Sequence, residues 1–441
     1  MSNSIDKCGA LEKFSQIAAK IGNQIHLRTL RDSFATIIPL YVLAGVATLL
    51  NTSVFPLLLS GDALKYATLW CTAISNGTLN FCAVIICALS GYFLARNMFY
   101  KNPLACAVVS LSALIVLMPA SVSATLSSDS KDSVNVVNAL IFDNTGVKGL
   151  FAGIIVGLLA SQIFIRLSSI EKLKIDLGEG IPPAVADTFN VLIPMLITLS
   201  IVSLFNVVLL VVFNLDLIAL IQYVVQKPLA QLGTSLFAVL FIYSMGNLLF
   251  FLGIHQSTIN GTLLQPILTV AISENMAAAA AGERIPHVLT MVSLDNFGQL
   301  GGTGCTICLI IATFIVGRNK ASKAVCSMSI LPGVFNINEP IIFGYPIVYN
   351  LSLLVPFILI PVLGIAIQYF ATVLGLIAYM RVYIPWNTPP ILSGFLATGG
   401  DIRAALLQAF IIVIGVLIYI PFVKLSERTE NLQLAEEKSK Q

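Results

Sequence analysis

Long stretches without a charged side chain constrain the fold of this chain more than any other feature. About 20 consecutive apolar residues cross the hydrocarbon core of a bilayer, and most of these stretches reach that length. Charged residues are 10% of the chain, against roughly 25% in an ordinary soluble domain. The sequence therefore predicts an all-α polytopic membrane protein. The stretches free of Asp, Glu, Lys and Arg cover residues 34–61, 66–95, 102–128, 149–165, 188–215, 228–273, 296–317, 340–380 and 404–423.

Two of these stretches have an awkward length. Residues 228–273 and 340–380 are too long for one span and too short for two spans joined by an ordinary loop. Each is expected to hold a helix and a segment that enters and leaves the membrane on one side. Glycine and proline interrupt helices, and their positions put these re-entrant segments near 254–272 and 332–346.

Basic residues flank alternate spans and predict the orientation of the chain. By the positive-inside rule, segments rich in Lys and Arg lie in the cytoplasm. The pattern places both termini there and requires an even number of spans. The N-terminus is polar for about thirty residues before the first apolar stretch, so no cleavable signal peptide is expected. The basic residues on which this orientation rests are Lys7, Lys13, Lys20, Arg28, Arg31, Arg96, Lys101, Arg166, Lys172, Lys174, Lys424, Arg428, Lys438 and Lys440.

Several segments outside the spans have their own character. The apolar positions of residues 1–33 recur at helical spacing, which is typical of an amphipathic helix on the membrane surface, and 216–228 fits a second one. The charged segment 166–187 is either a plain cytoplasmic connector or a docking surface. Gly149, Gly153 and Gly157 follow one another at four-residue spacing and indicate close helix packing.

The segment from Asn336 to Pro346 contains Glu339, the one formally charged side chain between Lys323 and Arg381. An acid at bilayer depth costs roughly 2.5 to 3.5 kcal/mol, so such residues usually face a cavity, a partner or a substrate. Broken backbone at that depth is tolerated where it is buried in protein or lines a watery cavity. The segment is therefore a candidate substrate site. The alternative is a proline-rich loop in the headgroup region, with Glu339 in solvent.

Two further segments carry isolated polar groups. His255 is the one imidazole in the stretch 228–273 and is either a ligand contact or a packing residue. Residues 385–390, Pro-Trp-Asn-Thr-Pro-Pro, join an indole to amide and hydroxyl groups. Such a combination suits the apolar faces and hydroxyl rims of a sugar, although an interfacial tryptophan anchor explains it equally well.

The remaining candidates are weaker. Asp295 and Asn296 precede a cluster of glycines at 301–304, which lacks the lysine and the spacing of a phosphate loop. Cys305 and Cys308 have a Cys-x-x-Cys spacing but no second pair or nearby histidines, so no metal site is expected. No cofactor and no nucleic-acid partner are expected either.

Taken together, these motifs resemble the membrane IIC components of the sugar phosphotransferase system, and among them the lactose/cellobiose/diacetylchitobiose family. The resemblance is carried by order as well as by identity, and it is most specific from about residue 230 to 425. The matching motifs are Gly253-Ile254-His255, Leu294-Asp295-Asn296-Phe297 with Gly301-Gly302-Thr303-Gly304, Asn338-Glu339-Pro340-Ile341-Ile342-Phe343-Gly344 and Pro385-Trp386-Asn387-Thr388-Pro389.

The resemblance implies an architecture for the whole chain. It predicts about ten transmembrane helices, two re-entrant hairpins and an elevator-like movement of the second half. Residues 34–228 would form a dimerisation half and 229–425 a sugar-binding half. The segments 1–33 and 426–441 would be a cytoplasmic N-terminal segment and a cytoplasmic tail. The protein would lie in a bacterial cell membrane as a homodimer.

The resemblance also implies roles for single residues. Glu339 and His255 would hold the sugar hydroxyl that receives phosphate. Trp386 and Asn387 would line the saccharide pocket. Further sugar contacts would come from Asn338, Asp295, Asn296, Thr145 and Gly146.

The implied function is a permease that transports a disaccharide of the cellobiose, diacetylchitobiose or lactose type and phosphorylates it on the way. The chain ends soon after its last span, so the phosphocysteine donor would be a separate IIB protein served by an IIA protein. The chain would act in catalysis as the membrane component of that phosphotransferase. The rival is an ion-coupled sugar transporter in which Glu339 relays a proton. A channel or a structural anchor would leave this carboxylate without a role.

Overall fold

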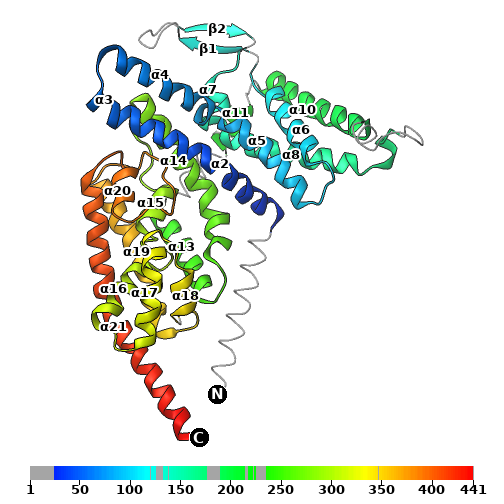
Figure 1. The fold of residues 1–441 in the computed structure, drawn as a ribbon. Helices are drawn as coiled ribbons and strands as arrows, with labels where there is room; N and C mark the ends of the chain where they lie inside the picture. Colours follow the sequence, from blue (N-terminus) through cyan, green and yellow to red (C-terminus); the bar gives the residue numbers. More distant parts are fainter. Residues whose placement is uncertain are drawn as a thin grey trace. The chain divides into compact units, whose positions relative to one another are not determined.

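The computed structural model describes residues 24–119, 121–125, 133–137, 139–175, 189–213, 217–221, 223–224, 235–345 and 347–440. Most of these residues are helical, and irregular stretches at 283–290, 298–305 and 374–391 interrupt the helices (Figure 1). Among the described residues the two strands form one hairpin, in which β1 (Ser121–Thr125) pairs antiparallel with β2 (Ser133–Val137). The charge pattern predicts helix over 102–128, but α6 (Pro103–Val116) ends early. Pro119 and the alternating serine and valine that follow it favour extended backbone.

The chain forms two compact units. Residues 24–43 and 72–231 belong to one of them, and residues 44–71 and 232–441 to the other, as far as these ranges are described. The long helix α2 (Ile25–Leu49) contributes to both, as does α4 (Gly61–Gly77). Residues 44–71 therefore belong with the C-terminal part of the chain. The dimerisation and sugar-binding roles of the halves 34–228 and 229–425 stay predictions.

The first unit, of residues 24–43 and 72–231, is built on helices that pack through small side chains. A Cβ atom on Gly153 would lie 2.4 Å from the Ala83 carbonyl oxygen, and one on Gly157 would lie 2.6 Å from that of Cys87. The close packing that the glycine spacing predicts is therefore confirmed for these two residues. The helices of this unit are α5 (Cys82–Asn97), α6, α7 (Phe142–Thr145), α8 (Leu150–Ser168), α10 (Leu192–Phe213) and α11 (Leu217–Ile221).

The second unit, of residues 44–71 and 232–441, carries the motifs singled out in the sequence. Its core includes buried Tyr243, Leu268, Leu294 and Ile365, which come from four different helices. After the short α3 (Phe55–Leu58), its helices are α13 (Leu236–Phe251), α14 (Gln265–Ala281), α15 (Met291–Phe297), α16 (Thr306–Val316), α17 (Lys320–Val334), α18 (Glu339–Gly344), α19 (Leu351–Val373), α20 (Leu392–Ala397) and α21 (Ile402–Lys440).

Seven helical segments among the described residues are long and apolar enough to cross a membrane. Three shorter apolar helices, α6, α13 and α16, accompany them. The chain is thus a multi-pass helical membrane protein, as the charge-free stretches predict. The count of ten spans stays a prediction. The seven segments are Ile25–Leu58, Gly61–Asn97, Val147–Ser168, Leu192–Phe213, Gln256–Ala281, Leu351–Val373 and Ile402–Glu430.

Both predicted re-entrant stretches contain breaks in the helices. Between α13 and α14 the chain makes one tight turn at Gln256–Thr258 and one wide turn at Asn260–Leu264. In the second stretch the break lies later than Pro332 and Gly333 predict, because α17 accommodates both in its last turn and ends at Val334. Whether either stretch leaves the membrane on its side of entry stays a prediction.

Other predicted segments are described only in part. Residues 1–23 and 176–188, which hold the N-terminal amphipathic pattern and much of the charged segment 166–187, lie outside the described residues. The predicted surface helix at 216–228 is represented by α11. The tail at 426–440 continues α21 without interruption.

The glycine contacts lead to a stability prediction. We expect Gly153→Ala and Gly157→Ala each to lower the stability of the detergent-solubilised protein by about 1 to 3 kcal/mol, because the added methyl group pushes α8 away from α5. Gly77→Ala is the matched control, since nothing lies within 4 Å of a Cβ atom there. Thermal unfolding followed by size-exclusion chromatography measures the effect. Equal melting temperatures in all three variants would contradict the packing argument.

Candidate functional site

His255 follows a helix that ends in a left-handed turn. Gly253, at φ 84°, lies just beyond α13. The Ile254 amide donates to the Leu249 carbonyl over 2.9 Å, and the Gly253 amide donates to that of Phe250 over 2.9 Å. These two bonds define a Schellman motif, in which a left-handed residue satisfies the last carbonyls of a helix. The motif turns the backbone away from the axis of α13, so His255 lies on a loop.

Glu339 follows the same kind of helix end. The Ile337 amide donates to the Pro332 carbonyl, and the Asn336 amide donates to that of Gly333, each over 3.0 Å. Asn336 takes the left-handed position, at φ 60°. Asparagine is tolerated there because its short polar side chain bonds locally. Glu339 then begins α18 and is exposed.

The side chain of Asn336 joins three motifs that are far apart in the sequence. Its Oδ1 accepts a hydrogen bond of 2.8 Å from the Gly301 amide. Its Nδ2 donates to the Trp386 carbonyl over 2.7 Å and to the Thr388 carbonyl over 3.2 Å. Asn336 itself is only 6% exposed. A single buried amide thus holds the glycine cluster and the Pro-Trp segment to the end of α17.

Asn338 adds a second bond between the same segments. Its Nδ2 donates to the Thr303 carbonyl over 2.8 Å. A Cβ atom on Gly302 would lie 2.5 Å from the Asn338 Cγ, and Gly302 has φ 95°. Only glycine fits at such a position, because any side chain would collide and the backbone conformation would be strained. The glycine cluster therefore serves close backbone packing around the Asn-Glu-Pro motif.

The segment after α18 packs against the loop that carries His255. The Tyr349 amide donates to the Phe251 carbonyl over 3.1 Å, and the Tyr349 hydroxyl donates to that of Leu252 over 2.9 Å. The chain thereby runs from Glu339 through α18 directly to the base of the His255 loop.

The hydrogen bonds of His255 indicate which ring nitrogen carries the hydrogen in the neutral imidazole. The Ser257 amide donates to His255 Nδ1 over 3.2 Å, and the Ser257 hydroxyl lies 2.8 Å from the same nitrogen. A nitrogen that accepts from an amide carries no hydrogen, so in the neutral ring the proton sits on Nε2. The Phe250 ring lies 4.9 Å from the imidazole, centroid to centroid. His255 is exposed and can therefore donate a hydrogen bond from Nε2, while Ser257 holds the ring through Nδ1.

Asp295 is connected to the His255 loop through two glutamines. Gln256 Nε2 donates to Gln299 Oε1 over 3.3 Å, and Gln299 Nε2 donates to Asp295 Oδ1 over 3.2 Å. Asp295 is 6% exposed and lies on α15. Its neighbour Asn296 is buried as well. In this structure both side chains lie behind the exposed surface.

The Pro-Trp segment presents its side chains outward. Trp386 is 50% exposed, and Asn387 is exposed too. The following residues are anchored by the buried Gln408, whose Oε1 accepts from the amides of Ile391 and Gly394, each over 2.8 Å. Gln408 Nε2 donates to the Asn296 carbonyl over 2.6 Å. The indole and the amide therefore sit on a braced segment and remain accessible.

Thr145 and Gly146 lie in the first unit, whereas the other predicted site residues all lie in the second. The Thr145 hydroxyl donates to the Asn80 carbonyl over 2.7 Å. A Cβ atom on Gly146 would lie 2.7 Å from the Phe142 carbonyl oxygen. Both residues thus have local structural roles, and their contact with sugar stays a prediction.

The site offers a carboxylate, an imidazole N–H, an indole face and an amide, all exposed on cross-linked backbone. Among the described residues, no group of three or more His, Cys, Asp or Glu side chains is placed to hold a metal ion. Cys305 and Cys308 are buried free thiols.

Comparison with known proteins identifies the family. The family model described as "Phosphotransferase system, EIIC" matches residues 31–361. The chain belongs to the EIIC family of the phosphotransferase system. This EIIC component is 30% identical to the lichenan permease IIC component of Bacillus subtilis (strain 168), over 95% of this chain and 92% of that protein. It is also 30% identical to the cellobiose-specific EIIC component of Lactococcus lactis subsp. lactis (strain IL1403), over 95% and 97%.

A solved structure supports the assignment. The crystal structure of the transporter ChbC, the IIC component of the N,N'-diacetylchitobiose-specific phosphotransferase system, superimposes with a TM-score of 0.85. It covers 96% of this chain and 98% of its own, at 30% identity. The predicted family and the helical membrane fold are confirmed. As an EIIC component, the chain is a sugar permease that works with IIA and IIB partners.

Sequence reasoning missed the residues that hold this EIIC site together. Asn336, Gln299 and Gln408 carry no charge and belong to no recognised motif core. The available signal was an amide side chain in an apolar setting, since a buried amide must find hydrogen-bond partners.

The role of Asn336 can be tested through Trp386. The chain has two tryptophans, so Trp70→Phe leaves Trp386 as the only reporter. In that background we expect Asn336→Gly to lower the fluorescence anisotropy of Trp386 and to weaken sugar binding by roughly fivefold to a hundredfold, because each lost buried partner costs about 1 to 3 kcal/mol. Glycine keeps the left-handed backbone and removes only the amide group.

Asn102→Ala is the matched control for this experiment. Asn102 also bonds a backbone amide through its side chain, that of Ala105, but it lies in the other unit. Unchanged anisotropy and unchanged affinity in Asn336→Gly would show that the Pro-Trp segment is positioned without Asn336.

Proposed function

We propose that this EIIC component binds a disaccharide of the cellobiose, diacetylchitobiose or lactose type and presents one hydroxyl group to a phosphorylated IIB protein. The observation that carries the proposal is the exposure of Glu339 and His255 on backbone that is cross-linked to the Trp386 segment. Three groups of different chemistry thereby share one braced framework. The names of the relatives, which include lichenan, cellobiose and diacetylchitobiose components, support a saccharide of this class.

Each exposed group has a distinct task in this proposal. The Trp386 indole stacks on a sugar ring, since aromatic faces suit its apolar C–H surface. The Asn387 amide bonds a ring hydroxyl. The Nε2–H of His255 donates to the oxygen of the reacting hydroxyl, most simply the 6-hydroxyl. Glu339 accepts the proton of that hydroxyl, which is general-base work.

The reaction proceeds as a phosphoryl transfer. The sugar oxygen forms a bond to phosphorus while the bond from phosphorus to the cysteine sulfur of IIB breaks. The proton moves from the hydroxyl to the Glu339 carboxylate, and the thiolate leaves with the electron pair. The protein contributes mainly position, because holding the two reactants in line removes much of the entropic barrier.

The proposal includes the surroundings of the site. Both termini lie in the cytoplasm, where IIB is available, and the protein acts as a homodimer with about ten spans in a bacterial cell membrane. The basic residues near Arg96 and Arg166 support this orientation. The rival ion-coupled transporter would release unmodified sugar, and the family assignment does not favour it.

Binding should depend on the Pro-Trp segment. We expect Asn387→Ala to weaken disaccharide binding by roughly fivefold to more than a hundredfold, because a buried hydroxyl of the sugar loses its partner. Trp386→Ala should weaken it as well. Trp70→Ala is the matched control, since Trp70 is similarly exposed, at 52%. Isothermal titration measures all three variants. Wild-type affinity in both Asn387→Ala and Trp386→Ala would remove this segment from the site.

Phosphorylation should depend on the base. We expect Glu339→Gln to retain sugar binding and to lose roughly a hundredfold to ten-thousandfold in phosphorylation rate, because Gln keeps the hydrogen bonds and cannot accept the proton. His255→Gln should reduce both binding and rate. The exposed Glu283 supplies the control Glu283→Gln. The assay supplies proteoliposomes with phosphorylated IIB and several disaccharides. Release of unmodified sugar alone by the wild-type protein would favour the ion-coupled alternative.

A further inference from the structure

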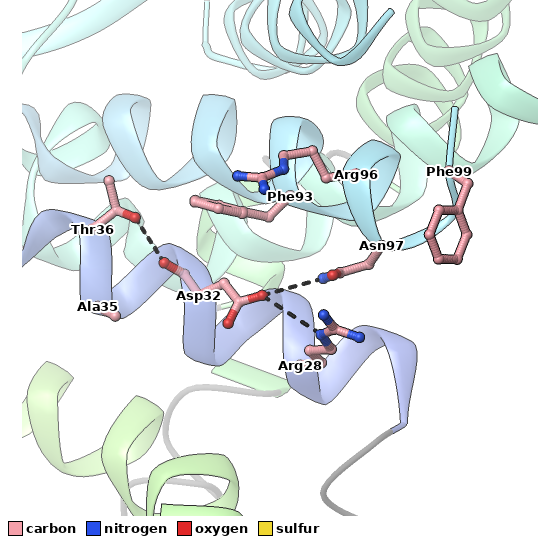
Figure 2. A pocket seen from close by; sticks show the side chains of 8 residues that line it. All are labelled: Arg28, Asp32, Ala35, Thr36, Phe93, Arg96, Asn97 and Phe99. Carbon is pink, nitrogen blue, oxygen red and sulfur yellow. Dashed lines mark hydrogen bonds and ion pairs between the residues drawn. The ribbon is translucent and has the colours of Figure 1, made fainter. Parts of the chain in front are cut away.

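A cavity whose lining is far in sequence from the motifs of the candidate site lies within the first unit. Its volume is about 490 Å³, and it lies between the first turns of α2 and the last turn of α5 (Figure 2). The cavity is of the size that takes a small ligand or a headgroup. It is lined by Arg28, Asp32, Ala35, Thr36, Phe93, Arg96, Asn97 and Phe99.

The single carboxylate of the cavity is already shared. Arg31 Nη2 donates to Asp32 Oδ1 over 3.0 Å, and Arg28 Nε lies 4.0 Å from Asp32 Oδ2. Asn97 Nδ2 also donates to Asp32 Oδ2, over 3.5 Å (Figure 2). Arg31 lies outside the cavity lining, so Arg28 and Arg96 face the single carboxylate of Asp32 within it, and the lining carries a net positive charge.

Arg96 adds a cation on the opposite wall. Its Cζ lies over two aromatic rings, 5.9 Å from the ring centroid of Phe93 and 6.0 Å from that of Tyr92. Among the described residues, no carboxylate pairs with it. A guanidinium over an aromatic ring keeps N–H groups free for two oxygens of an oxyanion such as phosphate. In Figure 2, Arg96 lies above Phe93 on α5, and α2 with Arg28 and Asp32 lies below them.

Phe99 places an apolar group beside these cations. It lies just beyond the end of α5 at φ 57°, a left-handed position that favours glycine or asparagine, and its side chain is 91% exposed. Exposed aromatic rings at the ends of membrane helices are typical of the headgroup level of a bilayer. The cavity therefore combines a cationic interior with an aromatic rim at the end of two spans.

We propose that this cavity binds the phosphate group of an anionic phospholipid, with Arg96 and Arg28 on the phosphate oxygens and Phe99 beside the glycerol and upper acyl chain. A phosphate diester matches the paired guanidinium groups, and basic pockets between membrane helices are known to hold lipid headgroups. Free inorganic phosphate shares the anion and lacks the apolar part. The exposed Phe99 favours the lipid as the source.

Native mass spectrometry of the whole protein in detergent tests the site. Phosphatidylglycerol is compared with phosphatidylcholine of the same acyl chains. We expect Arg96→Gln to weaken phosphatidylglycerol binding by roughly tenfold to a hundredfold, as for the loss of charge-assisted hydrogen bonds. Arg96→Lys should retain part of the affinity, because it keeps the charge. Arg166→Gln is the control, since Arg166 is an exposed cation in the last turn of α8, outside the cavity.

A variant that is expected to tighten lipid binding makes the test specific. Asp32→Asn removes the competing carboxylate and keeps a similar shape, so it should tighten binding severalfold. A purely structural role for Arg96 predicts no such gain. Equal retention of the two lipids, an equal loss in Arg166→Gln, or weaker binding in Asp32→Asn would overturn the proposal. Displacement of the lipid by inorganic phosphate at equal concentration would overturn the lipid as the source.

Discussion

The side-chain amide of Asn336 is the interaction on which the candidate sugar site depends. It satisfies the Gly301 amide and two carbonyls of the Pro-Trp segment at once, from a position buried against water. A buried donor or acceptor without a partner lowers stability by about 1 to 3 kcal/mol, so loss of any of these bonds is costly. Residues 301, 336 and 386 come from three separate parts of the sequence. Their common partner converts three loops into one rigid surface.

The two side chains proposed to hold the reacting hydroxyl follow the same kind of helix end. His255 and Glu339 each lie a few residues beyond a helix that ends in a left-handed residue, Gly253 or Asn336. A helix interior would commit their amides to the helix, whereas a Schellman end frees the following backbone while satisfying the carbonyls behind it. Both helices therefore end with their last carbonyls satisfied, and the side chains that follow are free of the helix.

Much of this could be predicted from the sequence, and the rest could not for identifiable reasons. Charge-free stretches predict the membrane helices because charged side chains are costly to bury in lipid and are therefore rare in such helices. The order of motifs indicates the family and points to Glu339, His255 and Trp386.

The hairpin of β1 and β2 follows from local strand propensity, which the charge pattern does not register. The break after α17 lies past Pro332, because tertiary bonds to Asn336 decide where that helix ends. Asn336 begins the segment that the sequence singles out, but its bracing role could not be predicted, because its partners are backbone groups that every residue type supplies.

Those backbone partners have an evolutionary consequence. Every residue type supplies a carbonyl oxygen, so the bonds from Asn336 to positions 386 and 388 do not depend on which side chains stand there. The side chains of Trp386 and Asn387 are exposed and take no part in the bonds from Asn336. A change of residue at either position alters the exposed surface and leaves these backbone hydrogen bonds in place. If the two side chains contact the sugar as proposed, single substitutions there can change specificity without removing the bonds that brace the segment.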